Sequence, residues 1–156
     1  MKRSGLVVSA VFGLVFLGAV NAASQEKHLK KSDLPAAVQK TADEQSKGAK
    51  VHGYASEVEG GQLQYEVETT LNGLSRDVSI APDGTVLEVE QQVTLESLPA
   101  AVREGLEKAA GAGKIMKVES LTKHGTLVAY EAQVKTGSNH SEIQVGPGGQ
   151  PLARRE

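Results

Sequence analysis

Acidic side chains that alternate with apolar ones are the feature of this 156-residue chain whose type and spacing could support chemistry. The pattern occurs at Glu57, Glu59, Glu66, Glu68, Glu88 and Glu90. Because side chains two residues apart share one face of a strand, these carboxylates are expected on the solvated face of a sheet. Negative charges on adjacent strands repel one another unless a partner supplies cations. The pattern therefore indicates either an ordinary polar face or a surface that binds a basic protein or Ca²⁺.

No residue cluster in the sequence identifies a reaction. The chain has no Cys, and none of its 4 His lies in a nucleophile motif or has the spacing of a zinc site. His124 and His140 fall in predicted turns or strand edges, where a solvated side chain is the simpler interpretation. The fragment DGT at 83–85 is too short for a calcium loop, and GPGG at 146–149 lacks the residues of a phosphate loop. We therefore expect a protein that is not an enzyme, with no catalytic, metal-binding or cofactor-binding residues and no cofactor.

The N-terminal segment 1–23 has the features of a secretory signal peptide. Lys2 and Arg3 precede an uncharged, almost wholly apolar stretch at 6–20, and small residues ending at Ala23 offer a cleavage site. A retained membrane anchor is the alternative, but the apolar stretch is short for a membrane span. We expect a periplasmic or secreted product with no stable membrane insertion after cleavage.

The composition of the cleaved chain excludes some partners. Cleavage would leave 15 basic against 19 acidic residues, a formal charge of −4. Nucleic acid is not expected as a partner, because phosphate binding needs a basic surface. Both Phe residues lie in the leader and the chain has no Trp, so the core must be built from Val, Leu, Ile and Ala.

The chain also contains an internal repeat. The sequence LPAAV occurs at 34–38 and again at 98–102, an offset of 64 residues. After one inserted residue the offset becomes 65 and continues to the C-terminal region, where turn residues such as Pro82 and Pro147 coincide. Such self-similarity is typical of a duplicated unit. It predicts one repeat at 32–93 and a second at 94–153.

Each unit is predicted to begin with a helix. Asp33 and Ser97 are suitable N-cap residues, and Pro35 and Pro99 would fall in the first helical turn. The apolar period then changes from helical to two, which indicates strands with one wet face.

Strands are expected around 51–58, 63–67, 74–80 and 85–93 in the first unit, and around 115–121, 128–134 and 140–145 in the second, whose fourth strand is curtailed. The predicted fold class is α+β, with two tandem repeats of one helix and a four-stranded antiparallel sheet, and the helices on one face. Each unit is too small to bury much surface alone, so we expect the two to share a continuous sheet or core.

The leading DLPAAV helix, the strand ending in YEVE and the hairpin VSIAPDGTVLEVE, all repeated behind a leader, resemble the PepSY-like proteins. Their fold is similar to that of the β-lactamase inhibitor protein. The resemblance covers nearly all of residues 32–153. It implies a small extracytoplasmic domain that binds or inhibits another protein, and no catalytic residues. That inhibitor presents an aromatic-rich sheet and has disulfides, whereas this chain has 3 Tyr and no Cys.

The expected partner is therefore a protein of the cell envelope or extracellular space. The candidate partner-binding residues are Tyr65, Glu66, Glu68, Tyr130 and Glu131. For the two tyrosines, packing in the core or across strands is the simpler alternative. A second functional hypothesis is a divalent-cation or small-ligand sensor that uses the acidic sheet face.

Overall fold

The structure is a computed structural model that describes residues 26–156. The predicted signal peptide lies outside the described residues. The elements are β1 (Lys27–Leu29), a 3₁₀ turn η1 (Lys31–Asp33), α1 (Ala36–Gln45), β2 (Lys50–Glu59), β3 (Gln62–Leu71), β4 (Leu74–Ile80), β5 (Val86–Val93), a second 3₁₀ turn η2 (Leu95–Ser97), α2 (Ala100–Ala110), β6 (Lys114–Lys123), β7 (Thr126–Thr136) and β8 (Asn139–Val145).

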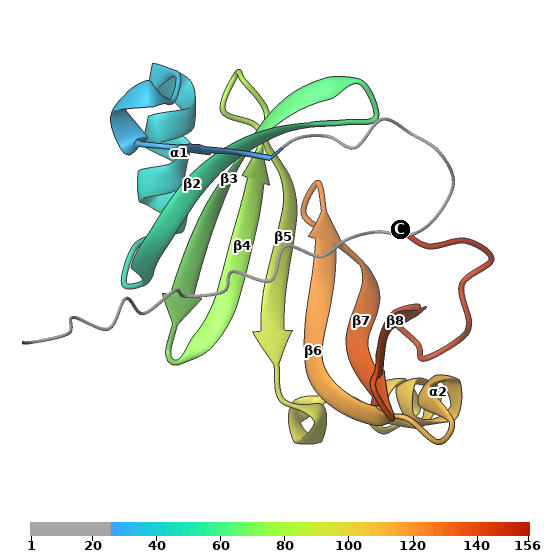
Figure 1. Ribbon diagram of the computed structural model, residues 1–156. Coiled ribbons are helices and arrows are strands. Elements are labelled where there is room, and N and C mark those ends of the chain that lie inside the picture. Colours follow the sequence, from blue (N-terminus) through green and yellow to red (C-terminus); the bar gives the residue numbers. More distant parts are fainter. Residues whose placement is uncertain (1–25) are drawn as a thin grey trace, which may run out of the picture.

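Within residues 26–156, one continuous antiparallel sheet of 8 strands contains every strand, and each strand pairs with the next along the chain (Figure 1). The two halves of the chain meet where β5 pairs with β6, over Glu88–Val93 and Val118–Lys123. The expectation of a shared sheet is confirmed. The repeat boundaries at 32–93 and 94–153 stay a prediction.

Helix α1 covers the first half of the sheet. Val38 and Ala42 of this helix pack with Val67, Val78 and Ile80 from β3 and β4. All five side chains are almost fully removed from water, at 0–1% exposure. Burial of this kind stabilises a fold by about 25 cal/mol per Å² of apolar surface, which fixes the helix on this side of the sheet.

Helix α2 covers the second half in the same way, with Val102 and Leu106 packed against strands β6, β7 and β8. Val89 contacts the first core cluster and Val93 the second, and both lie on β5, four residues apart. Residues four apart on a strand share a face, so both helices lie on the same side of the sheet. We call this side the helix face and the other the open face.

The predicted starts of the two helices are wrong by a few residues. Asp33 lies in the turn η1, where its carboxylate accepts the N–H of Lys30, and Pro35 is the residue that precedes α1. Pro99 precedes α2 in the same way. The fixed φ of proline is compatible with a position just before the helix, and the residue in front of each proline is held extended.

The predicted arrangement of four strands in each unit is met only in part, and the curtailed last strand expected in the second unit agrees with the structure. The second half has three strands, and its fourth is reduced to one bridge between Val145 and Pro151. Proline cannot donate to a strand ladder, and the chain leaves the sheet after it. The first half instead has the additional short strand β1, which pairs with Tyr54–Ser56. Within residues 26–156 neither helix is long and apolar enough to cross a membrane.

Candidate functional site

The open face of the sheet is strongly acidic. Strand pairing places on it the carboxylates of Glu57, Glu59, Glu66, Glu68, Asp77, Glu88, Glu90, Glu119, Glu131 and Glu142. Strands β3 and β5 contain no Lys or Arg. Arg76, the basic residue of β4, faces the other way and donates to Gln45 of α1 over 2.8 Å. The centre of the open face therefore has few positive charges of its own.

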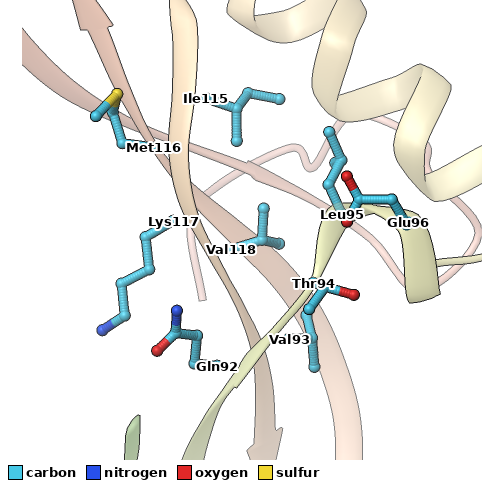
Figure 2. Close-up of a pocket in the computed structure, with 9 residues that line it drawn as sticks. All are labelled: Gln92, Val93, Thr94, Leu95, Glu96, Ile115, Met116, Lys117 and Val118. Atoms are coloured by element: carbon cyan, nitrogen blue, oxygen red, sulfur yellow. The ribbon is translucent and has the colours of Figure 1, made fainter. Parts of the chain in front are cut away.

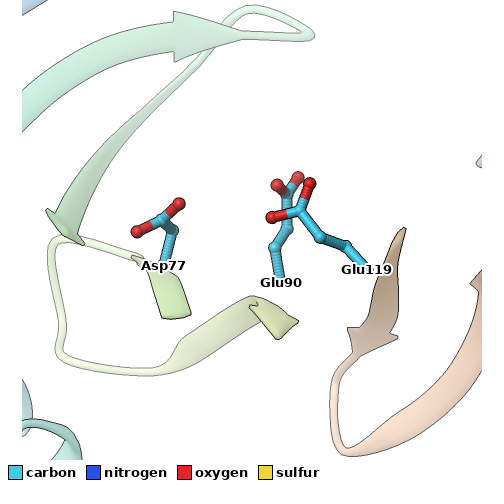
Figure 3. Close-up of side chains that lie close together, drawn as sticks. All are labelled: Asp77, Glu90 and Glu119. Carbon is cyan, nitrogen blue, oxygen red and sulfur yellow. The ribbon is translucent and has the colours of Figure 1, made fainter. Parts of the chain in front are cut away.

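Asp77, Glu90 and Glu119 form the tightest acidic group on this face. Asp77 of β4 lies directly opposite Glu90 of β5, and Glu119 comes from β6 beside them. One carboxylate oxygen of each residue lies within 4.8 Å of those of the other two. Figure 3 shows the three side chains directed toward one another. Oxygen atoms at this spacing could surround a single cation.

On the open face, the protonated form is favoured for two glutamates, Glu66 and Glu90. Burial, with added repulsion from Asp77 and neighbouring glutamates, raises the pKa of Glu66 to about 8. Burial and the nearby Glu119 likewise raise the pKa of Glu90 to about 8. Burial also raises the pKa of Asp77 to about 6, although the ammonium of Lys117 acts in the opposite direction. Near neutral pH this face holds protons that a cation could replace.

Two lysines of β6 already have partners on the open face. Lys117 Nζ lies 2.6 Å from Glu119 Oε1, and the side chain of Glu119 is only 6% exposed. Lys123 Nζ lies 3.7 Å from Glu88 Oε2, and its charge opposes the upward shift that burial causes in the pKa of Glu88. These pairs neutralise the edge of the acidic surface nearest the second half of the sheet.

A guanidinium occupies the second half of the open face. Arg155 Nη2 donates to Glu131 Oε2 at 2.7 Å and to Glu142 Oε2 at 3.0 Å. The backbone N–H of Glu156 donates to Gln144 Oε1 at 2.9 Å, so the C-terminal segment lies against this face. Burial raises the pKa of Glu142, and the hydrogen bond from Arg155 limits that rise.

The five sequence-predicted binding residues do not come together. Glu66 and Glu68 lie on the open face in the first half, and Glu131 lies on it in the second half. Tyr65 and Tyr130 lie on the helix face, where each packs against one of the two core clusters. Their position agrees with the packing alternative. Partner binding by these residues stays a prediction.

Sequence reasoning missed Asp77, Glu119, Glu142 and Arg155. For Asp77 the signal was present, because it alternates with Val78 and Ile80, which point into the core. The alternation of Glu119 with Val118 carried the same information. For Arg155 no local pattern existed, since its role depends on how the C-terminal segment folds back.

A hollow of about 260 Å³ lies where the two halves join, between the end of β5, η2 and the start of β6. Figure 2 shows Ile115 and Val118 directed toward Leu95, whereas Met116 and Lys117 project from the other side of β6. Met116 is 52% exposed, because a bulge in β6 turns it away from the core. The lining contains no His, Asp or Ser, so it lacks a hydroxyl–imidazole pair of the kind used in nucleophilic catalysis.

The four histidines are all exposed, and His28 lies on the edge strand β1 opposite Ala55. His124 lies in the β6–β7 turn with a positive φ of 48°, and His140 is exposed on β8. His52 Nε2 lies 2.7 Å from the hydroxyl of Thr70 at an exposed end of β2 and β3. Within residues 26–156 no side-chain hydrogen bond joins this imidazole to a carboxylate.

Comparison with solved structures identifies the fold. A protein from Bacteroides eggerthii, provisionally described as periplasmic, superposes with a TM-score of 0.64 at 21% identity, over 78% of this chain and 88% of that one. A BLIP-like protein from Bacteroides fragilis superposes with a TM-score of 0.59 at 17% identity, over 78% and 85%. A DUF2874 family protein from Bacteroides ovatus gives 0.60 at 18% identity, over 76% and 84%.

These similarities define a class of architecture: the chain has a BLIP-like fold, with two helices on one face of a single antiparallel sheet. No protein-family model matches the chain, and no curated protein sequence is similar to it. The PepSY-like assignment stays a prediction.

Proposed function

We propose that this protein is an exported, non-enzymatic binding module that holds a basic segment of another protein against its open face. The observation that carries the proposal is the set of partly buried carboxylates on β3, β4 and β5, two of which, Glu66 and Glu90, have a pKa of about 8. A partly buried carboxylate with so high a pKa is costly to ionise in the free protein. A cationic partner would remove that cost, so the interaction is favoured by charge complementarity.

The expected location of this interaction is the cell envelope or the extracellular space. The apolar stretch at 6–20 supports export, and a structurally similar protein is provisionally described as periplasmic. The chain has no Cys, so its stability does not depend on the redox state of that compartment.

Inhibition of an enzyme is one form that such binding could take, since a BLIP-like protein is among the similar structures. The open face does not favour an aromatic-anchored interface, however. Tyr54, Tyr65 and Tyr130 all contact the core clusters on the helix face. Tight interfaces usually rely on exposed aromatic or Arg anchors. Binding by charge is therefore better supported than binding of the kind that a Tyr-rich or Trp-rich surface provides.

Calorimetric titration of the purified protein with a cationic peptide, hexa-lysine or hexa-arginine, tests the proposal at low and high salt. We expect binding at low salt that weakens as salt screens the charges. The double variant Glu66→Gln/Glu90→Gln should bind more weakly, and the matched control Glu104→Gln/Glu107→Gln, on the exposed surface of α2, should bind like the wild type. Absence of binding, or equal loss in both double variants, would refute the proposal.

A divalent-cation sensor is the second candidate, and it is favoured by the approach of Asp77, Glu90 and Glu119 to within 4.8 Å. A bound metal would have to displace Lys117 from Glu119, which are 2.6 Å apart. A ligand that binds only the folded state increases the free energy of unfolding by about 2.7 kcal/mol when its concentration is one hundred times Kd. The melting temperature rises as a result. A melting temperature that is unchanged in millimolar Ca²⁺ or Mn²⁺ would eliminate this candidate.

A further inference from the structure

The two halves of the open face have the same strand register. Glu66 lies opposite Ser79 across β3 and β4, and Glu131 lies opposite Gln144 across β7 and β8. Both members of the second pair are 65 residues after those of the first. The same offset relates Asp77 to Glu142, which lie diagonally across from Glu66 and Glu131 respectively. The sheet thus holds two carboxylate pairs at equivalent positions of the strand register.

In the second half this pair holds a guanidinium. A single nitrogen of Arg155, Nη2, lies 2.7 Å from Glu131 and 3.0 Å from Glu142. The two carboxylate side chains are only 13% and 11% exposed, so the guanidinium replaces water that they have lost. Gln144 Nε2 also donates to Glu131 Oε2 at 2.8 Å and orients it. In this half, Glu131 and Glu142 are therefore paired with a cation of the same chain.

In the first half the equivalent pair, Glu66 and Asp77, faces a third carboxylate. The residue 65 positions before Arg155 is Glu90, which lies directly opposite Asp77. The ammonium of Lys117 acts on Asp77, but it already lies 2.6 Å from Glu119. Among residues 26–156 no Arg or Lys forms an ion pair with Glu66, Asp77 or Glu90.

We propose that Glu66, Asp77 and Glu90 form a subsite for the guanidinium of an arginine in the protein partner, which there makes the bonds that Arg155 makes to Glu131 and Glu142. The inference rests on the proposed binding of a basic segment and specifies where and how that segment is held. One observation distinguishes this subsite from a diffuse acidic surface: the equivalent pair in the same sheet, Glu131 and Glu142, already binds a guanidinium, that of Arg155.

Arginine fits this subsite better than lysine. A guanidinium is planar and has five N–H donors, so it can bridge carboxylates on neighbouring strands while keeping further donors for a third. An ammonium is a more compact and more strongly hydrated charge and loses more hydration on entering a partly buried site. The pair Glu131 and Glu142 shows that strands of this register accept a bridging guanidinium.

Calorimetric titration of the full protein with hexa-arginine, compared with hexa-lysine, tests the subsite. We expect hexa-arginine to bind more tightly, and we expect Glu66→Gln and Asp77→Asn each to weaken it by about tenfold, the equivalent of one charge-assisted hydrogen bond. Glu104→Gln on α2 carries the same loss of charge outside the open face and should leave the affinity unchanged. Thermal melts of each variant verify that it is folded.

The variant Arg155→Ala provides a second and independent readout. It frees Glu131 and Glu142, so the number of hexa-arginine sites should rise from one to two, while hexa-lysine should gain less. Equal binding of hexa-arginine by wild type, Glu66→Gln and Asp77→Asn would overturn the subsite and leave the proposed function standing. Equal affinity for the two peptides, or no second site in Arg155→Ala, would also overturn the guanidinium assignment. No binding of either peptide would overturn the proposed function as well.

Discussion

Replacement of Glu90 by Gln should stabilise the protein at high pH and leave it almost unchanged at low pH. Glu90 lies opposite Asp77 and beside Glu119 in the acidic group of the open face. Burial, followed by repulsion from Glu119, raises its pKa from 4.5 to about 8. The unfolded chain lacks both effects, so its Glu90 ionises near the ordinary value.

The sign of the pH dependence follows from these two values. Between pH 4.5 and about 8 the folded protein holds a proton on Glu90 that the unfolded chain has released. The contribution of Glu90 to the free energy of unfolding is therefore fully present below pH 4.5. It is lost as the pH rises through about 8 and does not change further above that.

The shift from 4.5 to about 8 sets the magnitude. At 1.36 kcal/mol per pKa unit it corresponds to at most about 5 kcal/mol. Neighbouring carboxylates can move apart and water can reach the strand when Glu90 ionises, so we expect Glu90→Gln to recover about 1–3 kcal/mol near pH 9. For a chain of this length that is a rise in melting temperature of about 4–12 °C. Near pH 4, where Glu90 is mostly protonated in both the folded protein and the unfolded chain, the expected change is within about 0.5 kcal/mol.

Thermal and urea unfolding at both pH values measure this difference. Glu104→Gln, on the exposed surface of α2, makes the same chemical change away from the open face and should show no such pH dependence. A Glu90→Gln melting temperature that differs from wild type by the same amount at both pH values would refute the electrostatic reasoning. A loss of stability at pH 9 would refute it more directly.

Four further outcomes follow from the same structure. Raising the salt concentration should raise the wild-type melting temperature near pH 9 more than near pH 5, and an equal effect would contradict repulsion on the open face. Leu106→Ala removes a fully buried side chain and should cost about 2–5 kcal/mol in urea unfolding, whereas a loss below about 1 kcal/mol would contradict its core position. Gly105→Ala should destabilise the protein by about 1–3 kcal/mol, because a Cβ at this position would overlap the carbonyl oxygen of Gly149, and this outweighs the higher helix propensity of alanine. The control Glu104→Ala changes the exposed neighbouring residue and should be neutral. Binding of hexa-arginine near neutral pH should release protons, which calorimetry in two buffers of different ionisation enthalpy detects as a difference in apparent enthalpy, and no difference would contradict the raised pKa of Glu66 and Glu90.

Much of the fold could be predicted because its strands alternate strictly. Leu63, Tyr65 and Val67 share one side of β3, and the structure places Tyr65 and Val67 against the core beneath α1. The same alternation placed Glu66 and Glu68 on the opposite side. Local pattern fixes which face a side chain occupies, since a shift by one residue would expose the whole apolar set.

The parts that could not be predicted depend on contacts between distant segments. Strand β1 is three residues long and has no pattern of its own, so it forms only where β2 offers an edge. The approach of Glu119 to Asp77 depends on β5 pairing with β6 in one particular register. Arg155 is one of two adjacent arginines in a polar segment, and only the fold of the segment selects it for Glu131 and Glu142.

The contrast between the two halves explains how a sheet can maintain so acidic a face. Where Arg155 is present, Glu131 and Glu142 are neutralised by a cation of the chain itself. Where Glu90 stands in its place, the free protein instead keeps protons on Glu66 and Glu90, because holding a proton near neutral pH costs less than ionising a partly buried carboxylate. A cationic ligand competes with those protons, so its affinity must rise with pH up to about 8, while the stability of the unliganded protein falls over the same interval. The first half of the open face is thus most receptive to a cation under the conditions in which the protein alone is least stable.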